Sequence, residues 1–173
     1  MRYRTGKMEI TVRHLMVMMK LGLVITLTAT IFSSHADIMG KVVRILDGDT
    51  IEVIEDKGVL TRVRLNGIDA PEKEQPFGQR SRQALTTLTA GKIVRVEGTK
   101  RDRYGRLLGT VWLDSSDINA AQIINGMAWA YRYRGKSIVP AYEYLEETAR
   151  KNRLGLWIEP AQEEPWRWRN NHK

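Results

Sequence analysis

The sequence predicts a small β-barrel with added helices, an α+β domain. Two observations support this prediction: five short runs rich in β-branched residues, and a stretch of helical period between the third run and the fourth. The five runs lie at 41–46, 50–54, 59–65, 93–96 and 107–113. Five strands with one helix inserted before the last two favour a barrel over a sandwich.

The chain is long enough for one compact domain with its own core, but hardly for two. It has 173 residues, no cysteine and a net charge of +8. Because cysteine is absent, a disulfide and a thiolate metal site are both excluded. The domain must therefore be stabilised by its core or by a bound ion.

The first 36 residues have the pattern of an export signal. Scattered basic residues precede a mostly apolar run at 21–32, and Ser34-His35-Ala36 follows with small residues at the two positions that a signal peptidase reads. Twelve residues fall short of the roughly 20 that span a bilayer as a helix. We therefore expect cleavage after Ala36, a periplasmic or secreted protein without a permanent membrane anchor, and a domain at 37–158. Met8 or Met16 could be the true start.

The first three strands form a meander. Turn signals at 47–49 and 56–58 separate them. In the third strand the two-residue period places Arg62 and Arg64 on one face of the sheet. That face is polar enough to carry a site.

Three helices are expected outside the strands. The first carries an apolar stripe and ends at Gly91, the second covers 118–127 with Asp117 as its cap, and the third begins at Pro140 and stops at Gly155. In the third helix Glu146 and Arg150 have the favourable i, i+4 order, on the side that we expect to be exposed.

The last fifteen residues, 159–173, are expected to be a flexible tail. Pro, Glu and Gln dominate its first part, and the stretch 166–169, Trp-Arg-Trp-Arg, is basic and aromatic. Such a stretch could contact nucleic acid or a membrane surface, but we favour disorder for it.

The chemistry is narrowed first by what is missing. Beyond the expected cleavage point the only histidine is His172, next to the C-terminus. Histidine acid–base catalysis, zinc hydrolysis and Ser-His-Asp acyl transfer therefore lack their central residue. Carboxylates and arginines remain, a combination that suits a hard cation and a phosphate group.

Two aspartates stand at strand ends, where a barrel can bring them together. Asp49 follows a tight turn, and Asp69 follows the third strand. At about 4 Å two such charges repel by roughly 4 kcal/mol at an effective dielectric of 20, so the pair would favour a bound cation. The alternative is that 47–49 is only a turn and that Asp69 caps a helix.

Several motifs together resemble the thermonuclease, or staphylococcal nuclease-like, family. The resemblance covers 41–157 and rests on motifs that stand in the family's order. These are Ile-Leu-Asp-Gly-Asp-Thr at 45–50, Val-Arg-Leu-Asn-Gly-Ile-Asp-Ala-Pro-Glu at 63–72, Asp-Arg-Tyr-Gly-Arg at 102–106, Asn119, Gly126 and Leu-Gly-Leu-Trp at 154–157.

The resemblance implies a five-stranded OB-fold and a calcium-dependent phosphodiesterase that cleaves DNA and RNA to products ending in 3′-phosphate. By position, Asp49 and Asp69 would bind Ca²⁺ through their side chains, and Ala70 would bind it through its backbone carbonyl. Glu72 would activate or orient the attacking water. Arg64 and Arg106 would hold the phosphate.

The resemblance also suggests substrate contacts. Arg103 and Tyr104 stand where the family binds a terminal phosphate or stacks a base. Either Tyr131 or Tyr133 would contact phosphate, with a one-residue ambiguity between them. Each of these residues also has an interpretation without a role in the site. The tyrosines would then pack at the core or the rim, and the charged residues would be solvated.

We therefore expect an exported, metal-dependent endonuclease that does not discriminate DNA from RNA. It would be a monomer without an obligate protein partner. Glu74 is a rival of Glu72 for the catalytic carboxylate. There are two alternatives. One is an inactive OB-fold module that binds nucleic acid, and the other is a cell-envelope domain with a structural ion.

Overall fold

The computed structural model describes residues 37–159 and 161–172. The expected export signal at 1–36 lies outside the described residues. Within these ranges no helix has the length and apolar character needed to cross a membrane.

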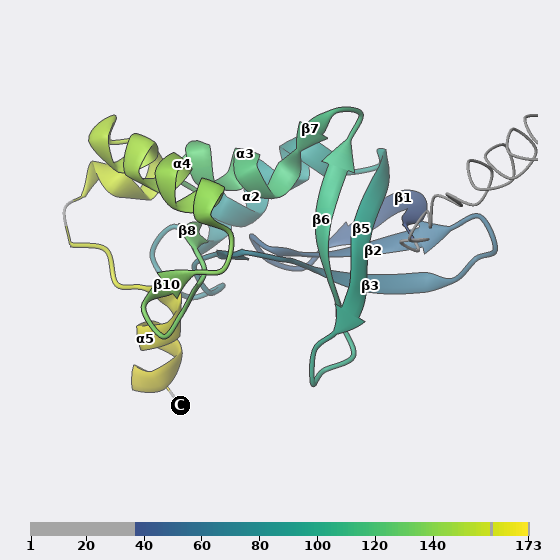
Figure 1. Cartoon of the computed structure of the whole chain (residues 1–173), viewed down its shortest axis with the longest axis horizontal. Coiled ribbons are helices and arrows are strands. Elements are labelled where there is room, and N and C mark those ends of the chain that lie inside the picture. Colours follow the sequence, from purple (N-terminus) through teal and green to yellow (C-terminus); the bar gives the residue numbers. More distant parts are fainter. Residues whose placement is uncertain (1–36, 160, 173) are drawn as a thin grey trace, which may run out of the picture. The chain divides into compact units, whose positions relative to one another are not determined.

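Five strands form a closed barrel, which confirms the predicted fold class and the OB-fold that the resemblance implies (Figure 1). The order in the sheet is β3-β2-β1-β5-β6, and β3 pairs in parallel with β6 to close the barrel. The bounds of these strands are β1 Ile38–Ile45, β2 Thr50–Glu55, β3 Leu60–Leu65, β5 Ile93–Arg101 and β6 Leu107–Leu113.

The barrel interior follows from the alternation of side chains along the strands. In β2, Ile51 and Val53 are fully buried, and in β3 the same is true of Val63 and Leu65. Successive strand residues point to opposite faces, so Arg64 lies on the other face of β3 from Val63. The apolar set therefore fixes the direction of the arginine that the site needs.

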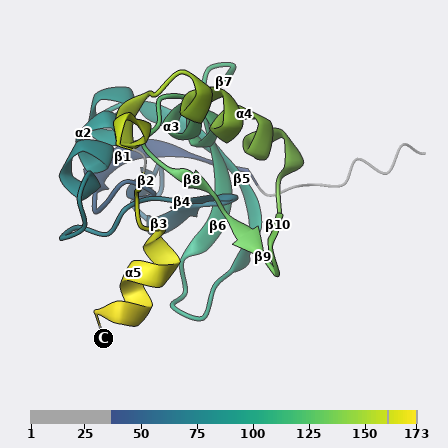
Figure 2. The same cartoon turned by 90° about the vertical axis from the view of Figure 1, so that its left-hand side faces the viewer.

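Three helices lie together beside the barrel: α2 Gly78–Thr89, α3 Ile118–Ile124 and α4 Pro140–Lys151. Helix α3 lies between the other two, and both views agree on this order (Figures 1 and 2). The predicted cap is present, because Oδ1 of Asp117 accepts the backbone N–H of Ala120 at 2.9 Å.

Five short strands and one turn of 3₁₀ helix lie outside the barrel strands and the three helices. They are β4 Ile68–Asp69, β7 Ser116–Asp117, β8 Trp129–Ala130, the hairpin of β9 Arg132–Tyr133 with β10 Lys136–Ser137, and the 3₁₀ turn Gly155–Ile158. Strand β4 pairs with β8, so the segment that carries Asp69 is part of a ladder and not a free loop.

Glu146 does not lie on an exposed face of α4, as the charge pattern had predicted. Its side chain is buried, accepts the backbone N–H of Ala130 at 2.7 Å and pairs with Arg132 at 3.0 Å. The predicted partner Arg150 is present at 2.8 Å. Glu146 therefore anchors β8, and through β8 it supports β4.

The expectation of a flexible tail at 159–173 is not met, because the structure contains a helix there, α5 Pro165–Asn171. Pro165 opens the first turn and is buried, and Trp166 packs against the cluster that contains Trp129 and Trp157. These long-range contacts, which composition does not reveal, hold the segment on the domain.

Candidate active site

An open cleft of about 560 Å³ gathers most of the predicted site residues. Its lining includes Asp49, Arg64, Asp69, Ala70, Glu72, Arg103, Tyr104, Arg106, Tyr131 and Arg169. Tyr133 does not line the cleft. It is 60% exposed on β9, and the guanidinium of Arg134 lies over its ring. Of the two tyrosines left open by the sequence, Tyr131 is the one in the cleft.

The turn before β2 fixes Asp49. The backbone N–H of Asp49 donates to Oδ1 of Asp47 at 3.1 Å, and Nε2 of Gln122 donates to the carbonyl of Gly48 at 2.7 Å. A side chain at Gly48 would collide with Ser81 Oγ and crowd the Ala70 methyl group. Glycine is thus required here by close approach, and the carboxylate of Asp49 is aimed from a rigid turn.

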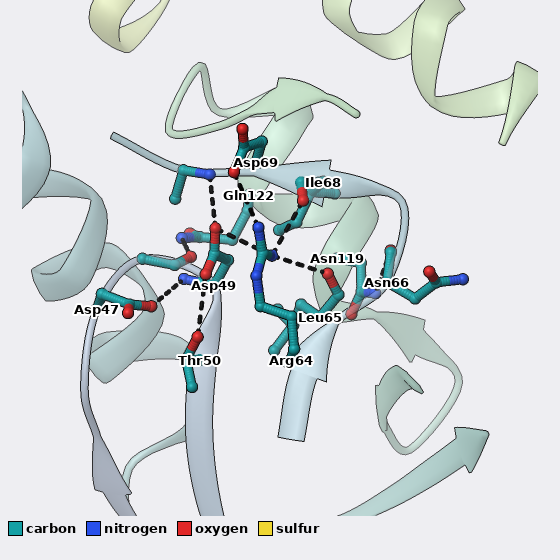
Figure 3. A network of polar contacts seen from close by, with 12 residues as sticks. Asp47, Asp49, Thr50, Arg64, Leu65, Asn66, Ile68, Asp69, Asn119 and Gln122 are labelled. Carbon is teal, nitrogen blue, oxygen red and sulfur yellow. Dashed lines mark hydrogen bonds and ion pairs between the residues drawn. The ribbon is translucent and has the colours of Figure 1, made fainter. Parts of the chain in front are cut away.

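Arg64 bridges the two aspartates from the end of β3 (Figure 3). Its Nη1 lies 3.0 Å from Oδ2 of Asp49, and its Nη2 lies 2.9 Å from Oδ1 of Asp69. Nη1 also donates to the carbonyl of Ile68 at 3.0 Å. The barrel therefore does bring both carboxylates to one point. Asp69 lies in β4, whereas the N-cap of α2 is Phe77, so the capping alternative does not hold.

Burial makes both carboxylates weaker acids than usual. It raises the pKa of Asp49 to about 6, an effect that Arg64 opposes and Asp47 reinforces. Burial also raises the pKa of Asp69, opposed by the hydrogen bond from Arg169 and by the charge of Arg64. Two buried anions this close require compensating positive charge.

The donor chemistry of the cleft fits a hard divalent cation. Among residues 37–159 and 161–172, no group of three His, Cys, Asp or Glu side chains is arranged as a metal cluster. Two buried carboxylates are nevertheless enough for Ca²⁺ or Mg²⁺, because backbone carbonyls and water supply their other ligands. Asp49 and Asp69 would hold the ion, and both now face guanidinium groups.

Ala70 and Glu72 follow β4 along the cleft. The backbone N–H of Ala70 donates to Oδ2 of Asp49 at 2.7 Å. Ala70 therefore orients the Asp49 carboxylate, a role that does not depend on its carbonyl binding a cation. Glu72 lies at the rim, and its Oε1 is 2.6 Å from Nη1 of Arg169. Its rival Glu74 does not line the cleft and is exposed, 3.8 Å from Lys73.

Arg106 lines the same cleft and is held in place by Asp102. Nε of Arg106 donates to Oδ2 of Asp102 at 2.7 Å, and Oδ1 of the same carboxylate accepts the backbone N–H groups of Tyr104 and Arg106. The ring of Tyr104 is 67% exposed and has the guanidiniums of Arg103 and Arg106 over it. The loop thus presents a cation and an aromatic ring side by side.

Three residues of the site escaped the sequence interpretation: Asp102, Gln122 and Arg169. Asp102 stood inside a recognised motif, at a spacing of four from Arg106, which was a usable signal. Gln122 is fully buried on α3 and gave none. Arg169 lies 100 residues from Asp69 in the chain, and its only signal is the basic aromatic stretch, whose composition favours disorder.

Comparison with known proteins agrees with this geometry. Residues 62–159, more than half of the chain, match the family described as staphylococcal nuclease homologue. The chain is 49% identical to "Protein ParB" of Escherichia coli, over 78% of this chain and 80% of that protein. It is also 49% identical to a micrococcal nuclease of Shigella flexneri, over 80% and 84% of the two chains. An uncharacterized endonuclease of Escherichia coli O157:H7 is 44% identical, over 78% and 87%. The chain belongs to the staphylococcal nuclease family.

Proposed function

We propose that this protein is an exported, metal-dependent endonuclease that hydrolyses the phosphodiester bonds of DNA and RNA and leaves 3′-phosphate ends. One observation supports this most strongly. A single cleft contains two buried aspartates, a rim carboxylate at Glu72 and two guanidinium groups, at Arg64 and Arg106. Relatives named micrococcal nuclease and endonuclease support the same reaction class.

The cation, which we propose to be Ca²⁺, would bind to Asp49 and Asp69. When bound, it would stabilise negative charge on the phosphoryl oxygens. Ala70 keeps Asp49 in place through its N–H group, and we propose its carbonyl as a further ligand. These groups require no movement of the barrel, because a turn and a short ladder fix them.

Side chains around the cation site would activate the attacking water and bind the phosphate. Glu72, at the rim, accepts a proton from the attacking water or orients it. Arg64 and Arg106 form hydrogen bonds to the phosphate and stabilise the charge that grows on its equatorial oxygens. Asp102 fixes the direction of Arg106. Planar guanidinium forks suit this task because they bind two oxygens at once.

Substrate binding would use the aromatic and basic residues of the cleft. Arg103 and Tyr104 form one wall, with the Arg103 guanidinium 4.8 Å from the ring centre, and Tyr131 also lines the cleft. Stacking of a base on a ring tolerates any sequence. We propose that these residues bind DNA and RNA without base selection, and that the enzyme acts as a monomer.

The test is a cleavage assay on the purified full-length chain. Single-stranded DNA, duplex DNA and RNA are incubated with Ca²⁺, with Mg²⁺ or with EDTA, and products are sized on gels. We expect cutting that EDTA abolishes and that Glu72→Gln lowers by about 10²–10⁴-fold. Glu74→Gln, in the same loop but outside the cleft, is the matched control and should cut normally.

Two outcomes would contradict the proposal. Intact nucleic acid under every condition, with binding retained in a mobility-shift assay, would leave only a binding module. Equal losses in Glu72→Gln and Glu74→Gln would remove Glu72 from the reaction. Mass spectrometry of short oligonucleotide products then tests the 3′-phosphate end, and fractionation of expressing cells tests export through residues 1–36.

A further inference from the structure

The C-terminal helix places an arginine on the carboxylates of the proposed cation site. Nη2 of Arg169 lies 2.8 Å from Oδ2 of Asp69, and Nη1 lies 3.2 Å from Oδ1 of the same side chain. Nη1 also donates to Oε1 of Glu72 at 2.6 Å. One guanidinium thus joins the buried aspartate to the rim glutamate that we propose as the base.

Helix α5 is fixed at its first turn but not along its length. Pro165 is buried, Trp166 packs against the Trp129–Trp157 cluster, and Nε2 of Gln75 donates to the carbonyl of Glu163 at 2.6 Å. Beyond Trp166 the helix is mostly exposed. The ion pairs of Arg169 with Asp69 and Glu72 therefore link the exposed part of the helix to the cleft. Figure 2 shows α5 as a separate helix away from α2, α3 and α4.

Arg169 and a divalent cation require the same oxygens. Asp69 is fully buried and already accepts from Arg64 and Arg169. A cation that binds its carboxylate would lie within a few ångströms of the Arg169 guanidinium, where like charges repel strongly. While Oε1 of Glu72 accepts this hydrogen bond from Arg169 at 2.6 Å, that oxygen is not available to accept a proton from water.

We propose that helix α5 is an autoinhibitory latch: Arg169 and the divalent cation bind Asp69 in mutually exclusive fashion, and Arg169 in the closed latch also holds Glu72. The closed latch occupies the acidic site and the catalytic carboxylate together. Cation binding displaces Arg169, opens α5 and frees Glu72. This inference rests on the proposed cation site, and it adds a regulatory element that the nuclease reaction does not itself require.

Linkage gives the latch a measurable consequence. If the cation weakens the Arg169 contact, then the Arg169 contact must weaken cation binding by the same factor. Removing the guanidinium should therefore tighten cation binding by about 5- to 150-fold, the usual range for two coupled sites. A residue that merely stabilised the fold would have the opposite effect or none.

The first experiment measures Ca²⁺ binding by isothermal titration calorimetry on the full-length chain. We compare the wild type, Arg169→Gln and Arg167→Ala. Arg167 is the matched control, because it lies in the same helix, is mostly exposed and pairs at 3.0 Å with Glu164, outside the cleft. We expect a lower Kd in Arg169→Gln and an unchanged Kd in Arg167→Ala.

The second experiment follows the latch directly. Trypsin cleavage after Arg167 and Arg169 is timed by mass spectrometry, with Ca²⁺ and with EDTA. We expect Ca²⁺ to accelerate this cleavage in the wild type by about tenfold and to have little effect in Asp69→Asn, which has lost the acidic ligand.

The outcomes separate the latch from the function on which it rests. Equal Ca²⁺ affinity in the wild type and Arg169→Gln would overturn the latch and leave the proposed nuclease function intact. The same holds if the protein binds Ca²⁺ but trypsin cleaves the C-terminal helix at the same rate with Ca²⁺ and with EDTA. No Ca²⁺ binding in any variant, with no cleavage of DNA, would overturn the proposed function and the latch with it.

Discussion

The guanidinium of Arg64 lies 3.0 Å from the carboxylate of Asp49, and the pair is almost entirely shielded from solvent. Arg64 is the residue that we propose to hold the substrate phosphate, yet here its charge compensates a buried anion. A bound cation would take over that compensation and release the arginine for the phosphate. The pair thus connects the stability of the site to its chemistry.

Replacing Arg64 should damage both properties. Arg64→Ala should lower the cleavage rate by about 10³–10⁵-fold, because it removes a charge that stabilises the transition state. In EDTA it should also cost about 3–5 kcal/mol of unfolding free energy, because Asp49 and Asp69 lose a shared partner. Initial rates and urea unfolding measure the two effects.

Arg64→Lys separates charge from shape. Lysine keeps the positive charge but cannot reach both carboxylates with a planar fork. We expect most of the stability to return and most of the activity to remain lost. Near-normal cleavage by the lysine variant would show that the fork is not needed.

Asp102→Asn should slow cleavage without weakening the cation site. Asp102 accepts from the side chain of Arg106 and from two backbone N–H groups in its loop. The amide would misplace the guanidinium, and an error of about 1 Å can cost on the order of 100-fold in rate. Ca²⁺ affinity, measured by calorimetry, should stay at the wild-type value. A parallel loss of Ca²⁺ affinity would mean that the loop supports the cation site as well.

The contribution of Asp49 to the stability of the metal-free protein should fall as pH rises from about 4 to above 6. Burial raises the pKa of Asp49 to about 6, above its usual value near 4, so the folded state binds the proton more tightly than the unfolded chain. This group therefore stabilises the fold at low pH, and its contribution of about 3 kcal/mol is lost as pH rises through about 6. Asp69, whose pKa is also raised, acts in the same direction.

Urea unfolding in EDTA at a series of pH values measures that slope. Asp49→Asn cannot titrate at this position, so the difference in stability between the wild type and this variant gives the contribution of Asp49, while Asp69 titrates in both. In the wild type, Ca²⁺ affinity should rise with pH up to about 6, because only the carboxylate binds the ion. The same pH dependence of stability in the wild type and in Asp49→Asn would contradict the raised pKa of Asp49.

Gly48→Ala should distort the turn that carries Asp49. The new methyl group would collide with Ser81 and approach Ala70, and overpacking of this kind costs about 1–3 kcal/mol. Gly58→Ala is the control: Gly58 has a φ of +75° and open space around it, so only backbone strain is added. Both variants should lose stability, but only Gly48→Ala should lose Ca²⁺ affinity. Normal Ca²⁺ binding by Gly48→Ala would show that the turn adapts.

The sequence predicts the barrel well because strand patterns are local. The alternation of Val63, Arg64 and Leu65 defines an inner and an outer face without knowledge of any partner strand. The sequence also predicts that Asp49 and Asp69 lie close together, since both stand at strand ends and barrel closure brings such ends together.

What the sequence does not predict depends on contacts between distant segments. Glu146 was expected on an exposed face because its spacing to Arg150 is typical of surface pairs, yet Ala130 and Arg132 lie over it. Helix α5 is not predicted for the same reason, because its basic and aromatic residues indicate no packing partner and its anchor, Trp166, needs a partner cluster that only the fold provides.

The most direct test of the central claim is to measure cation occupancy and DNA cleavage in one titration. Ca²⁺ binding and initial cleavage rate are followed over the same concentrations in the wild type and in Asp69→Asn. We predict that the two midpoints agree within about twofold, and that Asp69→Asn shifts both by the same factor, about tenfold or more. Two results would contradict a single site that both binds the ion and hydrolyses DNA. One is cleavage that persists without Ca²⁺ binding, and the other is a change in only one of the two midpoints in Asp69→Asn.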